Sequence, residues 1–192
     1  MTVSYIIYMI STIAWFLTIF SQKKSSVFLF FLILGLSDPL FLLFNYIVKV
    51  PNGVVYSFAA ISFYMVFRFN DFKSIKLKLI DYSVFIAFFY VVFTLSYIYY
   101  FVLGVHIYIL FKFIKRIITA LHFQGELLIF FLVLVFYEIS LLFKGIIFIA
   151  GTGQGFYLFF ITLAFQILIA IFFIIFREDN PKLIIKMTEG NL

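Results

Sequence analysis

Residues 27–48 read VFLFFLILGLSDPLFLLFNYIV, and this stretch decides the fold class. Asp38 is its only charged residue. A helix needs about 20 apolar residues to cross the hydrocarbon core of a bilayer. The stretch therefore predicts a transmembrane helix with one carboxyl group near its middle. A charge at that depth costs about 2.5–3.5 kcal/mol on insertion scales, so it requires a partner or a polar cavity.

The composition of the whole chain leads to the same class. Of its 192 residues, 66% are hydrophobic, 24% aromatic and 11% charged, and none is cysteine. A soluble domain is about 45–50% apolar and about 25% charged, so this composition excludes a soluble domain, a disordered chain and a disulfide scaffold. We expect an all-α integral membrane protein. The excess of Phe and Tyr is typical of an AT-rich bacterial genome, which favours the bacterial cytoplasmic (inner) membrane.

Seven apolar runs predict seven transmembrane helices. They cover residues 3–21, 27–48, 54–67, 79–103, 105–123, 127–150 and 156–176. The predicted organisation is a single transmembrane domain over residues 1–176 and a short cytoplasmic tail over residues 177–192. The run 105–123 is interrupted by cations, so a basic amphipathic helix lying on the membrane surface stays open for it.

The cations predict the direction of the chain. The net charge is +6, and twelve of the fourteen Lys and Arg residues fall on one side when the seven runs alternate. By the positive-inside rule, that side is cytoplasmic, with the N-terminus outside and the C-terminus inside. Because these cations sit in short loops between apolar runs, the positive charge indicates topology, and we expect no nucleic-acid partner.

Two acids lie at matching depths inside predicted helices, Asp38 in residues 27–48 and Glu138 in residues 127–150. Pro39 removes a backbone donor and frees the carbonyl of Gly35, which predicts a kink beside Asp38. Lys144 is six residues after Glu138 and off its stripe, and it is kept as a candidate charge partner. Polar residues at helical spacing complete the expected ligand- or proton-binding set: Asp38, Glu138, Asn45, Gln166 and Thr162.

The two acids also align in an internal repeat at an offset of 100 residues. Residues 29–34 match residues 129–134, and Asp38 falls on Glu138. The repeat predicts a 3+1+3 plan of parallel repeats with a linking fourth helix, which places a site between the repeats at mid-depth. In plan, it resembles PQ-loop sugar transporters, nicotinamide riboside transporters and rhodopsins. The chain has no Pro-Gln pair, one tryptophan and no lysine in its last span, so it is assigned to none of them.

These features predict a protein that binds or transports a small polar or cationic solute, or a coupling proton, at an intramembrane carboxylate pair. The alternative is a seven-helix sensor or accessory subunit that acts through a protein partner or as a homo-oligomer. A lipid-modifying intramembrane enzyme is the least favoured reading, since no catalytic motif occurs. We expect no cofactor. His106 and His122 lie too far apart to share a metal ion.

Overall fold

The computed structural model describes residues 2–49, 51–69, 77–150 and 155–187. This part of the chain forms seven helices, two short strands and one 3₁₀ turn. In chain order the elements are α1 (Thr2–Ser21), α2 (Phe28–Val48), α3 (Asn52–Arg68), α4 (Leu79–Thr94), α5 (Ile98–Gln124), β1 (Glu126–Leu128), α6 (Ile129–Ala150), α7 (Gly155–Ile175), η1 (Pro181–Leu183) and β2 (Ile184–Lys186).

Three helical segments are long and apolar enough to cross a membrane. They are Phe28–Ile47, Ile129–Ala150 and Tyr157–Ile175, in α2, α6 and α7. The helical segments Tyr5–Ser21, Gly53–Arg68 and Leu79–Thr94 are apolar but shorter. The all-helical fold with these three spans fits a membrane protein. The crossing of the membrane by all seven helices, and the direction of the chain, remain predictions.

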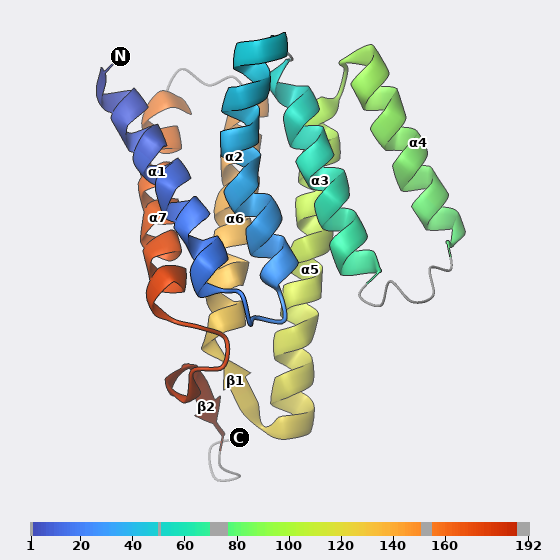
Figure 1. Cartoon of the computed structure of the whole chain (residues 1–192). Helices are drawn as coiled ribbons and strands as arrows, with labels where there is room; N and C mark the ends of the chain where they lie inside the picture. The colour runs from blue at the N-terminus through green and yellow to red at the C-terminus, as the bar shows by residue number, and fades with distance from the viewer. Residues whose placement is uncertain (1, 50, 70–76, 151–154, 188–192) are drawn as a thin grey trace.

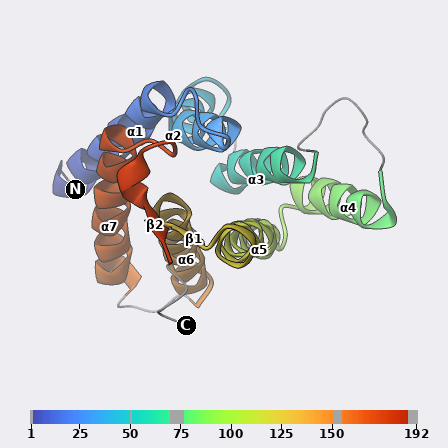
Figure 2. The ribbon, with the colours of Figure 1, turned by 90° about the horizontal axis from the view of Figure 1, so that it is seen from below.

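Six of the helices form a closed ring (Figure 2). Around the ring, α1 packs on α2, α2 on α3, α3 on α5, α5 on α6, α6 on α7, and α7 on α1. Helix α4 lies outside and packs on α3 and α5. The two sets of three helices predicted as repeats thus occupy the two halves of the ring. Their relation as repeats remains a prediction.

The break before α5 lies elsewhere than the sequence suggested. Gly104 was expected to end one helix, but it lies inside α5, and the break falls at residues 95–97. Leu95 and Tyr97 adopt left-handed backbone angles there, with φ of 55° and 59°. The Thr94 hydroxyl oxygen accepts a hydrogen bond from the Ser96 backbone N–H, so a side chain replaces a helical backbone acceptor.

A cluster of aromatic side chains fills the half of the ring nearest the two strands. Phe31 packs against Phe173 with ring centroids 4.9 Å apart, and Phe130 packs against Phe173 at 5.0 Å. Edge-to-face pairs of this kind add about 0.5–1.5 kcal/mol each beyond their buried area. The members of this aromatic cluster are almost wholly buried and come from four helices: Phe30, Phe31, Phe113, Phe130, Phe131 and Phe173.

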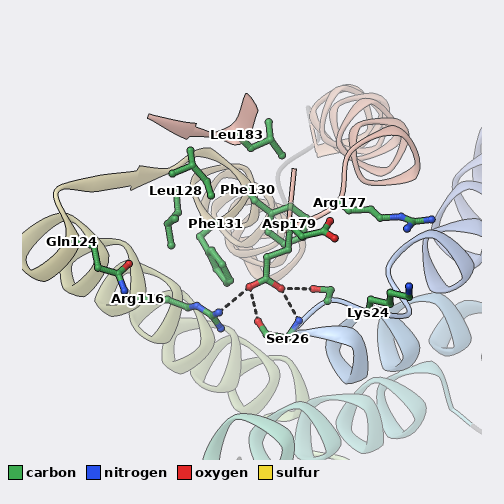
Figure 3. A pocket seen from close by; sticks show the side chains of 13 residues that line it. Lys24, Ser26, Arg116, Gln124, Leu128, Phe130, Phe131, Arg177, Asp179 and Leu183 are labelled. Carbon is green, nitrogen blue, oxygen red and sulfur yellow. Dashed lines mark hydrogen bonds and ion pairs between the residues drawn. The ribbon is translucent and has the colours of Figure 1, made fainter. Parts of the chain in front are cut away.

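The segment after α7 folds back on this same end of the ring. Strand β2 pairs antiparallel with β1, which precedes α6. The Glu178 carboxylate accepts hydrogen bonds from the Ser26 backbone N–H at 2.6 Å and from the Ser25 hydroxyl at 2.8 Å. Arg116 of α5 donates to it from the other side at 2.8 Å (Figure 3). Glu178 therefore joins the α1–α2 connection, α5 and the end of α7, and we call these contacts the Glu178 clasp.

Further hydrogen bonds join α1 to α7 beside the clasp. The Ser21 hydroxyl donates to the Phe173 carbonyl at 2.8 Å. The buried Gln22 amide donates to the carbonyls of Phe173 and Phe176. These bonds satisfy carbonyl groups in the last turn of α7, which lack partners within the helix.

Helix α4 is anchored to the ring through Asp81 in its first turn. The fully buried Asp81 carboxylate accepts hydrogen bonds from the Tyr64 hydroxyl at 2.6 Å and from the Arg68 guanidinium at 2.8 and 3.0 Å. It also accepts the Lys78 backbone N–H at 2.6 Å, which caps α4. One acid thus ties the start of α4 to the end of α3.

Gly35 allows α1 and α2 to approach closely, and Gly35→Ala tests this contact. A methyl group added at Gly35 would lie 2.7 Å from the Trp15 carbonyl oxygen. A methyl group added at Gly104 would meet no described atom within 4 Å apart from its own helix backbone and chain neighbours. We expect Gly35→Ala to destabilise the protein by about 1–3 kcal/mol through overpacking. Gly104→Ala, the control, should be neutral or stabilising by up to about 1 kcal/mol. Thermal unfolding in detergent measures both, and an equal effect of the two changes would contradict the assignment.

The Glu178 clasp predicts a difference between two neighbouring acids. Glu178→Gln removes the charge that holds Arg116, Ser25 and Ser26 together. Because these groups are partly exposed, we expect a loss of about 1–2 kcal/mol in the same unfolding assay. Asp179→Asn, the same chemical change at an exposed neighbour, should shift stability by less than about 0.5 kcal/mol. A Glu178→Gln protein as stable as Asp179→Asn would show that the clasp contributes nothing.

Candidate functional site

A cavity of about 320 Å³ lies inside the ring, in the half away from the strands. All six ring helices line it, mainly through the N-terminal halves of α1, α3, α5 and α7 and the middle or C-terminal half of α2 and α6. In Figure 1 this is the upper half of the ring. The aromatic cluster occupies the other half. The volume is within the range of small-molecule sites, about 300–1,000 Å³.

Asp38 of α2 lines this cavity. Asp38 is half-buried, and its carboxylate forms no ion pair within 4.0 Å in the described part of the chain. The hydroxyl of Tyr8, on α1, lies close to this carboxylate and interacts with it. Burying a carboxylate without an opposite charge is costly, so the part of the cavity beside Tyr8 and Asp38 suits a polar or charged group of a ligand.

Lys144 of α6 lines the same cavity. In the ring of Figure 2, α6 stands opposite α2, because two helices separate them on either side. The Lys144 ammonium lies 4.3 Å from the centroid of the Phe159 ring, a cation–π contact. Lys144 and Asp38 interact electrostatically across the cavity, but no ion pair within 4.0 Å joins them. Both charges therefore remain available to a ligand.

Glu138 does not line the cavity, but it contacts His106, which does. Its Oε2 atom is 2.8 Å from Nδ1 of His106, and its side chain is fully buried. Its second oxygen, Oε1, has no hydrogen-bond partner in the described part of the chain. His106 lines the cavity, so the imidazole connects the cavity to Glu138.

The sequence did not identify His106. Placing the helix break at Gly104 left this histidine at the start of a span, near the membrane surface. Because α5 begins at Ile98, His106 is two turns inside the helix, level with Glu138. A helix boundary predicted between Thr94 and Ser96, instead of at Gly104, would have placed His106 inside the following helix.

The remaining candidate residues take different places. Gln166 lines the cavity and donates a hydrogen bond to the buried Ser140 hydroxyl at 3.1 Å. Thr162 is buried, and its hydroxyl donates to the Phe159 carbonyl of its own helix at 2.8 Å. Asn45 is exposed and does not line the cavity. Helix α2 continues through Pro39, and Gly35 makes the close contact with α1.

A second pocket, of about 440 Å³, surrounds the Glu178 clasp. Glu178 and Arg116 at its centre pair with each other, whereas Asp38 and Lys144 in the central cavity form no ion pair within the described residues. The central cavity is therefore the better candidate site. The described residues contain no group of three or more His, Cys, Asp or Glu that could hold a metal ion.

The chain was compared with protein-family models, with curated proteins and with solved structures, and none of them matches it.

Proposed function

We propose that the protein binds a small polar or cationic solute in the central cavity and carries it across the bacterial cytoplasmic membrane. The observation that carries this proposal is the Asp38 carboxylate, which faces a cavity inside a ring of apolar helices and forms no ion pair within 4.0 Å among the described residues. Ionisable groups inside membrane helices are costly, and they mark solute and ion pathways. A solute ammonium or hydroxyl group bound to Asp38 would compensate this cost.

The His106–Glu138 pair is the proposed proton site of the same cycle. Histidines and carboxylates form the proton relays of many membrane transporters. Here His106 touches the cavity and Glu138 lies one hydrogen bond further from it. Protonation of this pair changes the charge beside the bound solute. Solute binding at Asp38 would thereby respond to proton binding at the His106–Glu138 pair, whose Nδ1 and Oε2 atoms are 2.8 Å apart.

The ring offers a route for alternating access. The helices α1–α3 and α5–α7 form its two halves, and in the proposed 3+1+3 plan these halves rock about the site between them. With all seven helices spanning the membrane and the N-terminus outside, the cavity lies toward the outer surface. The aromatic cluster closes the cytoplasmic side. The structure would then correspond to an outward-facing state.

Substitution of each acid tests the proposal in proteoliposomes. We expect Asp38→Asn and Glu138→Gln each to lower uptake at least about tenfold, since each loses a charge-assisted contact. Uptake is measured separately for radiolabelled methylammonium, choline and alanine, with a pH-sensitive dye inside the vesicles. Asp179→Asn is the matched control at the polar end of the molecule.

Two results would contradict transport. One is uptake by both variants at the wild-type rate. The other is wild-type uptake no faster than in empty vesicles for every solute in the set. Either result favours a sensor or accessory subunit, which a stoichiometric protein partner retained in mild detergent would support.

A further inference from the structure

Besides His106, the central cavity is lined by one carboxyl group and one amine, which lie on opposite walls. Asp38 projects from α2 and Lys144 from α6, and these helices stand across the ring from each other. The two groups interact electrostatically, yet they do not meet as an ion pair. The Asp38–Lys144 arrangement is therefore a carboxyl group and an amine that line one cavity without contacting each other.

Each end of this pair has features that suit one part of a ligand. At the acid end, the Tyr8 hydroxyl lies close to the Asp38 carboxylate and interacts with it, so a ligand ammonium at Asp38 would meet a second oxygen. At the base end, the Lys144 ammonium rests on the face of Phe159 and donates no hydrogen bond within the described chain. Between them the wall is mostly apolar, with side chains such as Leu103, Leu141 and Leu163.

Charge balance decides which ligands suit the cavity. A simple cation would be attracted to Asp38 and repelled by Lys144. A simple anion would be attracted to Lys144 and repelled by Asp38. Both effects are strong where water is scarce. A ligand that carries an ammonium at one end and an acidic group at the other is attracted at both ends. It also leaves the net charge of the site unchanged, which limits the cost of placing it inside the membrane.

We propose that the cavity binds a small zwitterion, with its ammonium group at Asp38 and its anionic group at Lys144. This inference rests on the proposed solute-binding function and names the chemical class of the solute. Free amino acids and the phosphoethanolamine headgroup of phospholipids share this chemistry. The Lys144 ammonium binds the carboxylate or phosphate, and the Asp38 carboxylate accepts hydrogen bonds from the ammonium.

Matched probes separate the contributions of the two charges. Each set contains an amino acid, its amide, which keeps only the positive charge, and its N-acetyl form, which keeps only the negative charge. Sets based on alanine, leucine and phenylalanine vary the apolar part. Phosphoethanolamine and short-chain lysophosphatidylethanolamine, compared with ethanolamine, form the headgroup arm. Binding to the purified full-length protein is measured by calorimetry and by thermal shift in detergent.

We expect the zwitterion of at least one set to bind about tenfold or more tightly than either singly charged relative. Lys144→Met should abolish the preference over the amide, and Asp38→Asn should abolish the preference over the N-acetyl form. Lys144→Arg should retain the preference over the amide. The controls Lys186→Met and Asp179→Asn lie at the polar end and should leave all affinities unchanged.

The outcomes separate this inference from the function on which it rests. If an amide binds the wild-type protein as tightly as its zwitterion in every set, the zwitterion proposal is wrong, while solute binding stands. If no probe binds and no solute is transported, both proposals fail. Preference for phosphoethanolamine alone supports the zwitterion and assigns it to lipid headgroups. Unchanged preferences in Lys144→Met would show that Lys144 is only structural.

Discussion

The packing of the aromatic cluster is the interaction on which the rest of the structure depends. The six helices pack side by side in a ring, and large buried phenylalanine rings fill one half of its interior. Across the two halves of the ring, Phe30 contacts Phe113, and Phe31 contacts Phe130 and Phe173. The other half of the ring retains a cavity, and this is where Asp38 and Lys144 lie. Hydrophobic packing at one end thus determines where polar chemistry is available at the other.

Much of this arrangement could be predicted from the sequence because intramembrane charges are rare. The low charge content made Asp38 and Glu138 conspicuous, and the length of the apolar runs located most helices within a few residues. Contacts between helices were not predictable. Asn45 shares the nominal stripe of Asp38, but it lies two turns beyond the last cavity residue of α2 and is exposed. His106 was missed because hydropathy does not show where two adjoining apolar helices separate.

The role of Lys144 shows the same limit. The sequence suggested Glu138 as a candidate charge partner of Lys144, because the two residues lie six positions apart on α6. In three dimensions Glu138 pairs with His106 of α5, and Lys144 faces the cavity that Asp38 enters from α2. Helical periodicity gives the face of a residue within its own helix. The helix opposite that face depends on the closure of the ring, which is a property of all six helices together.

The hydrogen bonds of Ser21 and Gln22 and the Glu178 clasp have a mechanical consequence. They hold the seam between α1 and α7 at the end of the ring occupied by the aromatic cluster. Helix α4, which links the two halves along the chain, stands outside the ring and is anchored through Asp81 to α3. A movement that preserves these bonds has its pivot at the clasped end. The largest displacement would then fall at the opposite end of the ring, in the half that contains the cavity.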